Sequence, residues 1–101
     1  MKELQILPRA RLDIYEIWHH IAKDSVEAAI RVNAEIDSEL ENLRSFPGKG
    51  HTRAELKDKT LRVWRVYSYL IAYRYDDQHV KVIRVVHGAR NLRTIFRGKG
   101  K

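Results

Sequence analysis

Residues 61–87 of this chain read LRVWRVYSYLIAYRYDDQHVKVIRVVH, and this stretch decides the fold. It contains three runs rich in Val, Ile and Tyr, residue types that favour β-strands. The runs are Leu61–Tyr67, Tyr69–Tyr75 and Val80–His87. The links between them are short: Tyr67-Ser68 and then residues 76–79. Because links of this length join antiparallel neighbours, the stretch predicts a three-stranded antiparallel meander.

Before the meander, the pattern changes from that of a strand to that of a helix. Residues 3–7 alternate polar and apolar side chains, which indicates a short strand that Pro8 ends. From Arg9 the apolar side chains recur every three or four residues, the spacing of one helix face. This apolar stripe consists of Ile14, Ile17, Trp18 and Ile21. The polar side chains expected to lie off the stripe are Asp13, Glu16, His20 and Lys23.

A second amphipathic helix is expected after Asp24 or Ser25, since either side chain can cap a helix N-terminus. Pro47-Gly48 should end this helix at Ser45 or Phe46. Its apolar positions are again spaced by three or four residues: Ala29, Val32, Ile36, Leu40 and Leu43. The link between the two helices is short, so they are predicted to pack as an antiparallel hairpin.

The end of the chain completes the predicted fold. Gly88 ends the last strand, and residues 89–96 can form one or two further helical turns. The fold class is therefore α+β: an N-terminal strand, a helical hairpin, a three-stranded antiparallel meander and a short C-terminal helix, in the order β-α-α-β-β-β-α. A length of 101 residues fits one domain over 1–101. Residues 97–101 are expected to be a frayed tail.

Composition narrows the function classes. The chain has no cysteine, which excludes disulfides and thiolate metal sites. It also has no apolar stretch near the roughly 18 residues of a membrane span, and its start lacks the apolar core of a signal peptide. We therefore expect a cytoplasmic protein. The adjacent His19 and His20 diverge on a helix and make a poor metal pair, so they are read as a solvated face. We expect neither a metal nor a cofactor.

Charge is distributed unevenly along the chain. Residues 1–52 hold seven Lys or Arg and nine Asp or Glu, a net charge of −2. Residues 53–101 hold thirteen and four, a net charge of +9. A basic half of this kind attracts nucleic acid, acidic protein segments or anionic surfaces, and the charge alone does not choose among them.

The strands of the meander carry apolar residues on both faces. On strict alternation, one face of the last strand holds Val80, Val82, Arg84 and Val86, and the other holds Lys81, Ile83, Val85 and His87. The helical hairpin must cover one face of the sheet. The second face, dotted with Arg and Tyr, is then a candidate docking surface. The alternative is that the tail of the chain or a dimer mate covers this second face.

Several segments resemble ParE-type toxins of the ParE/RelE superfamily. The run Ile14–Ala29 is similar to their first helix and helix junction. Pro47, Gly50 and Arg53–Leu56, followed by Leu61-Arg62 at a strand start, keep the order and spacing of these toxins. The strongest match is RVVHGAR, residues 84–90, at the end of the last strand. The resemblance covers nearly the whole chain and implies the same fold.

The resemblance also implies a function, the toxin of a bacterial type II toxin–antitoxin pair. ParE-like members are described as poisoning DNA gyrase, whereas RelE-like relatives cut messenger RNA on the ribosome. RelE-like enzymes resemble one another in a catalytic Tyr or His near the C-terminus, and the tail after Arg90 has neither. This favours inhibition of gyrase by protein contact, without chemistry of its own. A third alternative is a structural or DNA-binding relative without toxicity.

The implied partners are a cognate ParD-like antitoxin and gyrase, with operator DNA reached only through the antitoxin and no membrane contact. Residues proposed to bind target or antitoxin are Arg65, Tyr67, Tyr69, Arg74, Arg84, His87, Arg90, Arg93 and Arg97. In a helical tail, the last three arginines would share one side. For a ribonuclease, the candidate catalytic residues are instead His87, Arg84, Arg90 and His51. A simpler role for His87 is that of a half-buried residue that bonds the backbone at the strand end.

Overall fold

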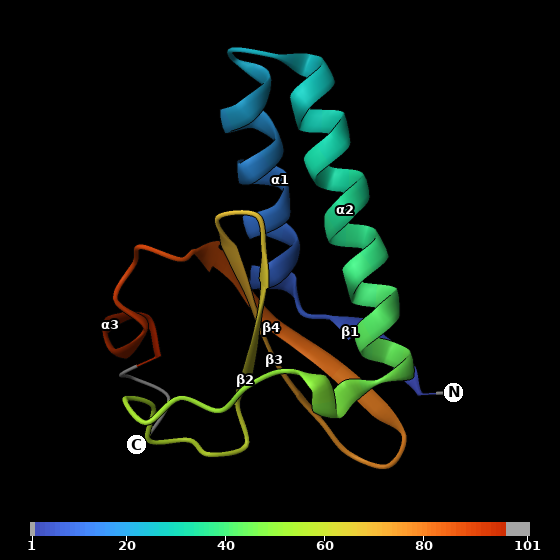
Figure 1. Ribbon diagram of the computed structural model, residues 1–101, viewed down its shortest axis with the longest axis vertical. Helices are drawn as coiled ribbons and strands as arrows, with labels where there is room; N and C mark the ends of the chain where they lie inside the picture. The colour runs from blue at the N-terminus through green and yellow to red at the C-terminus, as the bar shows by residue number, and fades with distance from the viewer. Residues whose placement is uncertain (1, 97–101) are drawn as a thin grey trace.

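The computed structural model describes residues 2–96 and has the predicted order of elements. Two helices and a turn follow the first strand, and three strands and a short helix follow them (Figure 1). The first half comprises β1 (Glu3–Ile6), α1 (Pro8–Ala22), α2 (Val26–Ser45) and the 3₁₀ turn η1 (Pro47–Lys49). The second half comprises β2 (Arg62–Val66), β3 (Tyr69–Tyr75), β4 (His79–His87) and α3 (Leu92–Phe96). The α+β fold class is confirmed.

One mixed sheet forms the centre of the molecule, with strand order β1-β4-β3-β2. The last three strands pair antiparallel, as the short links predicted. The first strand adds to the outer edge of β4 in parallel, from Glu3 beside His79 to Ile6 beside Val82. No local pattern indicates this pairing, because a parallel neighbour can lie far along the chain.

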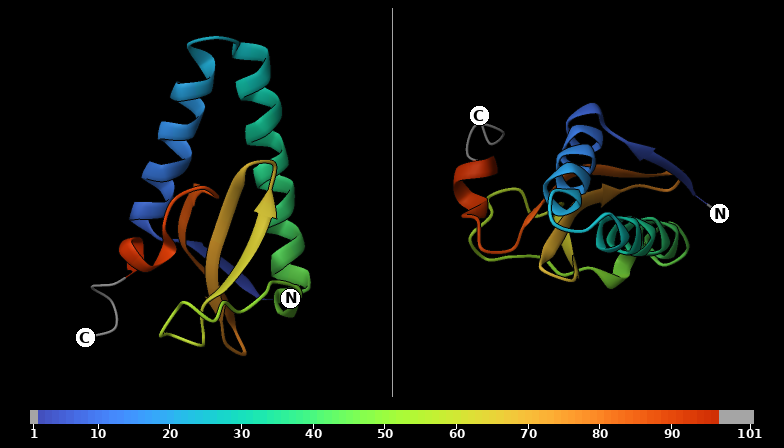
Figure 2. Two further views of the ribbon diagram at one scale, coloured as in Figure 1. Left: turned by 60° about the vertical axis from the view of Figure 1, so that its left-hand side comes forward. Right: turned by 90° about the horizontal axis from the view of Figure 1, so that it is seen from above.

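The two helices form the predicted antiparallel hairpin, and its tip extends well past the sheet (Figures 1 and 2). Pro8 occupies the first turn of α1, where a missing backbone N–H costs nothing. Ser25, rather than Asp24, caps α2: its Oγ accepts a hydrogen bond from the backbone N of Ala28 at 3.0 Å. No helix in the described part of the chain is long and apolar enough to cross a membrane.

The first core lies between the hairpin and the sheet. Its buried members come from both helices and three strands: Ala10, Ile36, Leu40, Leu43, Val66, Ile71, Tyr73, Val80, Val82 and Val85. The largest, Tyr73, is fully buried and still satisfies its hydroxyl. That hydroxyl donates to the carbonyl of Pro47 at 2.6 Å and accepts from the N–H of Gly50 at 2.9 Å. Burial raises the pKa of Tyr73, so the hydroxyl remains a donor at neutral pH.

A second core covers the opposite face of the sheet. The chain's own loop before β2 supplies Leu56 and Leu61, and α3 supplies Leu92 and Phe96. These side chains pack on Val63, Leu70, Ala72 and Val86 of the strands. The expectation of an open apolar face for docking is therefore wrong for the part of the sheet that this layer covers. The alternative was that the chain's tail or a dimer mate covers this face. The chain does cover it, with α3 and the loop before β2.

A β-bulge also corrects the predicted faces of β4. The register shifts between Ala72 and Tyr73 of β3, which lie beside Arg84 and Val82 of β4. Ile83 is thus an extra residue, and an extra residue reverses the alternation beyond it. The faces beyond the bulge are therefore exchanged: Val80, Val82 and Val85 share the first core, while Val86 joins the second.

Candidate functional site

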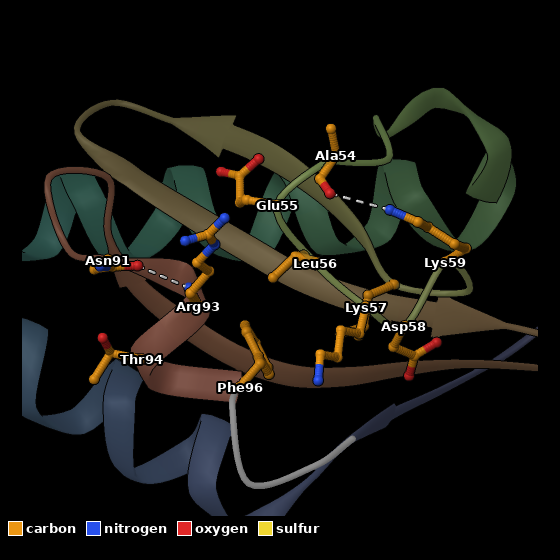
Figure 3. A pocket seen from close by; sticks show the side chains of 11 residues that line it. Ala54, Glu55, Leu56, Lys57, Asp58, Lys59, Asn91, Arg93, Thr94 and Phe96 are labelled. Carbon is orange, nitrogen blue, oxygen red and sulfur yellow. Dashed lines mark hydrogen bonds between the residues drawn. The ribbon is translucent and has the colours of Figure 1, made fainter. Parts of the chain in front are cut away.

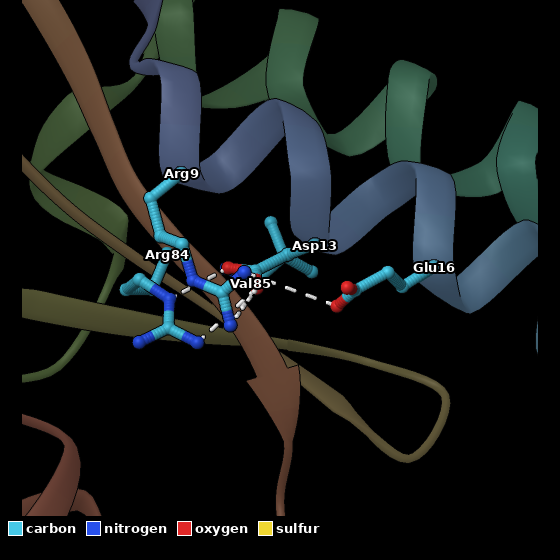
Figure 4. A network of polar contacts seen from close by, with 5 residues as sticks. All are labelled: Arg9, Asp13, Glu16, Arg84 and Val85. Carbon is cyan, nitrogen blue, oxygen red and sulfur yellow. Dashed lines mark hydrogen bonds and ion pairs between the residues drawn. The ribbon is translucent and has the colours of Figure 1, made fainter.

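A buried carboxylate on α1 fixes the arginine that begins the RVVHGAR motif (Figure 4). Asp13 is 5% exposed and accepts two hydrogen bonds from Arg84, from Nε at 2.8 Å and from Nη2 at 3.2 Å. It also accepts the backbone N–H of Val85 at 2.9 Å. Arg9, one turn earlier, approaches the same carboxylate at 3.5 Å and Glu16 at 3.9 Å.

Asp13 takes the place of a strand partner at the edge of β4, because β1 is too short to reach Val85. Strand β1 stops at Ile6, opposite Val82, so the outer edge of β4 has no strand partner at Val85. A buried backbone N–H must find an acceptor, and the Asp13 carboxylate supplies it. The helix pattern places Asp13 off the apolar stripe and does not indicate that it is buried. The guanidinium of Arg84 is 14% exposed and is paired with this carboxylate.

Five of the residues proposed for binding gather where the β2–β3 turn meets the turn that follows β4. We call Arg65, Tyr67, Tyr69, His87 and Arg90 the turn-end cluster. Tyr69 and His87 are paired across β3 and β4, with their ring centroids 5.6 Å apart in an edge-to-face arrangement. Arg90 lies close to His87, because its backbone N–H donates to the carbonyl of His87 at 3.0 Å.

Gly88 holds the two turns of this cluster together. Its N–H donates to the carbonyl of Ser68 in the β2–β3 turn at 2.7 Å. A Cβ at this glycine would lie 3.2 Å from both terminal nitrogens of Arg65, so the guanidinium of Arg65 lies directly over the Gly88 backbone. The same guanidinium donates to the carbonyl of Tyr67 at 3.4 Å. Sequence reasoning read Gly88 only as a strand terminator and missed this role.

The turn-end cluster is accessible to a partner. Tyr67 is 51% exposed and adopts φ 54°, a left-handed conformation that is uncommon for an aromatic residue. His87 is also exposed, which corrects the expectation that it is half-buried. The other part of that expectation is right, because the ring Nδ1 accepts the backbone N–H of Ala89 at 3.1 Å. In the neutral ring Nε2 therefore carries the proton.

The other proposed binding arginines lie elsewhere. Arg84 is held by Asp13, and Arg74 donates to Asp58 at 2.7 Å. Arg93 lies on α3, which begins at Leu92, so Arg90 precedes the helix and the predicted helical stripe of arginines does not form in the described residues. Arg97 lies outside the described residues.

Of the four residues considered for a ribonuclease site, His87 and Arg90 lie together, whereas His51 and Arg84 lie away from them. His51 pairs with Val63 on the outer edge of β2, and its ring stacks on Trp64 with centroids 6.1 Å apart. Arg84 lies three strand spacings away, about 14 Å at the usual distance between neighbouring strands. His87 is three residues further along β4. His51 itself extends the sheet edge, whereas the later part of its loop, with Leu56 and Leu61, packs on one face of the sheet. No group of three or more His, Asp or Glu side chains within residues 2–96 is arranged to hold a metal ion.

Comparison with known proteins identifies the family. The family model described as the ParE toxin of the type II toxin–antitoxin system parDE matches residues 4–92, which is most of the chain. The chain belongs to this ParE toxin family. It is thus a toxin of the type II toxin–antitoxin class, as its sequence resemblance implied. No curated protein matches it.

Two solved structures share the ParE fold of this chain. One is the chromosomal ParDE toxin–antitoxin system from P. aeruginosa, with a TM-score of 0.71 and 17% identity, covering 86% of this chain and 96% of that one. The other is the RelBE2 toxin–antitoxin complex from Mycobacterium tuberculosis, with a TM-score of 0.66 and 20% identity, covering 85% and 96%. At these identities the likeness concerns the fold alone.

Proposed function

We propose that this ParE-family toxin inhibits DNA gyrase by protein–protein contact, with the turn-end cluster as its main contact surface. One observation carries the proposal: aromatic and cationic side chains gather at one end of the sheet, whereas His51 and Arg84, two of the four candidate nuclease residues, lie away from them. Tyr and Arg are the residue types that contribute most binding energy at protein interfaces. Membership of the ParE family supports gyrase as the target.

A ParD-like antitoxin neutralises the toxin in this proposal. Both structural relatives come from toxin–antitoxin systems, which supports such a partner here. The net charge of +7 favours an antitoxin with an acidic binding segment. Operator DNA is then reached through the antitoxin, and the toxin acts in the cytoplasm, where gyrase works.

The proposal predicts that two substitutions in the turn-end cluster weaken gyrase inhibition. Tyr67→Asn removes the exposed ring and keeps a residue type that tolerates positive φ, and Arg90→Glu reverses an exposed charge. In a supercoiling assay, the double variant should need at least about tenfold more protein for half-inhibition, which corresponds to roughly 1.4 kcal/mol of binding. Adding the cognate antitoxin should restore supercoiling by gyrase treated with the original protein.

A matched control uses the same residue types on the helical hairpin. Tyr15 is 62% exposed on α1, and Arg31 is exposed on α2. The Tyr15→Asn and Arg31→Glu double variant should inhibit gyrase like the original protein. Equal loss in both double variants would refute the proposed surface. Ribosome-dependent mRNA cleavage that disappears in His87→Ala would replace gyrase inhibition with the RelE-like alternative, with which the fold is compatible.

A further inference from the structure

A cleft lies between α3 and the loop before β2, and none of the turn-end cluster residues lines it (Figure 3). Its volume is about 790 Å³, within the range of small-molecule pockets in proteins. Its floor is apolar, because Leu56, Leu61 and Phe96 of the second core line it. The family match ends at Leu92, so the α3 side of the cleft lies almost entirely beyond the matched residues.

The rim of the cleft carries three cations. Arg93 comes from α3, Lys57 and Lys59 come from the loop, and Figure 3 shows Arg93 and Lys57 on either side of Leu56. Lys59 Nζ is held at the rim by the carbonyl of Ala54 at 3.2 Å. Within residues 2–96, neither Lys57 nor Arg93 forms an ion pair.

The two acids of the cleft are already paired with arginines that do not line it. Asp58 accepts from Arg74 at 2.7 Å, and Glu55 accepts from Arg53 at 3.2 Å. Hydrogen bonds from Thr60, together with the charge of Arg74, lower the pKa of Asp58, so this carboxylate stays ionised and occupied. Arg93 also interacts with Glu55 through its charge. The three cations and two acids that line the cleft leave it with a net charge of +1.

Two neutral groups add hydrogen-bonding capacity on the α3 side. Asn91 uses its Oδ1 to accept the backbone N–H of Arg93 at 3.0 Å, which leaves its side-chain NH₂ available as a donor. Thr94 is exposed and contributes a hydroxyl. The cleft thus combines an apolar floor, cations and neutral donors within one small volume.

We propose that this cleft binds a nucleotide, with the base against Leu56 and Phe96 and the phosphate between Lys57 and Arg93. Cationic side chains form strong, charge-assisted hydrogen bonds to phosphate oxygens. The apolar floor favours a ligand with a ring over inorganic phosphate. The limited volume of the cleft favours a small molecule over an extended acidic peptide. This inference is independent of the gyrase proposal.

The test is a titration of the full chain with adenosine monophosphate, followed by NMR. Saturable chemical-shift changes should map to residues 54–61 and 91–96. Lys57→Gln with Arg93→Gln should weaken binding at least about tenfold. Inorganic phosphate alone should bind more weakly than the nucleotide, and so should adenosine. Because the readout is binding in the absence of gyrase, failure of the gyrase proposal leaves this result unaffected.

Matched controls separate a site from general attraction. Lys23→Gln with Arg31→Gln removes the same charge from the exposed surface of the hairpin and should change the affinity less than about twofold. Thr94→Glu puts a negative charge at the cleft without removing a cation, and it should also weaken binding. The inference fails if shifts do not saturate, if both double variants lose affinity equally, or if inorganic phosphate matches the nucleotide. It also fails if hexaglutamate displaces the nucleotide and binds more tightly.

Discussion

At the scale of single residues, Gly50 is required for a steric reason. It is buried, and a Cβ at this position would lie 2.3 Å from the Tyr73 hydroxyl oxygen. Gly50→Ala should therefore lower the free energy of unfolding by about 1–3 kcal/mol, because the tyrosine must move and its hydrogen bonds to Gly50 and Pro47 weaken. Urea unfolding followed by circular dichroism measures the change.

Gly48 provides a control two residues earlier. A Cβ there would lie 3.5 Å from the Tyr75 hydroxyl oxygen, an ordinary contact. Gly48→Ala should therefore change the free energy of unfolding by less than about 0.5 kcal/mol. Equal losses in the two variants would mean that loss of glycine flexibility, and not the Tyr73 contact, governs this turn.

At the scale of elements, Glu39 joins α2 to the 3₁₀ turn and to β2. Its carboxylate accepts Trp64 Nε1 at 2.8 Å and Lys49 Nζ at 3.3 Å, and Lys49 lies 4.4 Å from the Trp64 ring centroid. Burial alone would raise the pKa of Glu39, but these hydrogen bonds outweigh it and lower the pKa from the ordinary 4.5. The three elements therefore share one ionised group.

This pKa shift predicts a pH-dependent contribution to stability. Because the folded-state pKa of Glu39 is lowered, the contribution is complete above the unfolded pKa near 4.5 and is lost as pH falls through the folded pKa. The difference in free energy of unfolding between the original protein and Glu39→Gln should shrink from pH 7 towards pH 3. Urea titrations at several pH values measure it. Glu35→Gln, at an exposed position of the same helix, should change the free energy of unfolding at pH 7 by less than about 0.5 kcal/mol.

The helices and strands could be predicted from the sequence, but some contacts between them could not. Helix spacing, the Ser25 cap and Pro47 specify α2, and Val-, Ile- and Tyr-rich runs specify the meander, because these signals are local. The bulge at Ile83 depends on how β3 pairs with β4, and the buried pair of Asp13 and Arg84 depends on where β1 ends against β4. That contact joins residues about seventy positions apart, so no local pattern indicates it.

The candidate site was predictable to a similar degree. Arg65, Tyr67 and Tyr69 are close in sequence and surround one turn, so their grouping follows from the hairpin. Their proximity to His87 and Arg90 follows from the register of β3 and β4. The pairing of Arg84 with Asp13 was not predictable, because the sequence does not show which carboxylate this arginine meets.

At the scale of the whole molecule, the sheet is shared by two cores, and this predicts that they unfold together. The strands that bury the first core on one face bury the second on the other. Leu56→Ala in the second core should lower the free energy of unfolding by about 2–4 kcal/mol. Fluorescence of Trp18 and Trp64, one on the hairpin and one on β2, should shift to the same lower urea midpoint as circular dichroism. Such coincident transitions would support the single domain predicted over 1–101.

Leu12→Ala is the control for this coupling, since Leu12 lies on α1 and is 44% exposed. It should change the midpoint little, because nearly half of Leu12 is already exposed to water. If Leu56→Ala leaves the tryptophan transition in place and alters only part of the circular dichroism change, the loop and α3 form a separable layer. The sheet would then stay folded against the helical hairpin after the loop and α3 have unfolded. Because these two segments line the proposed nucleotide cleft, ligand binding would be lost before the global transition.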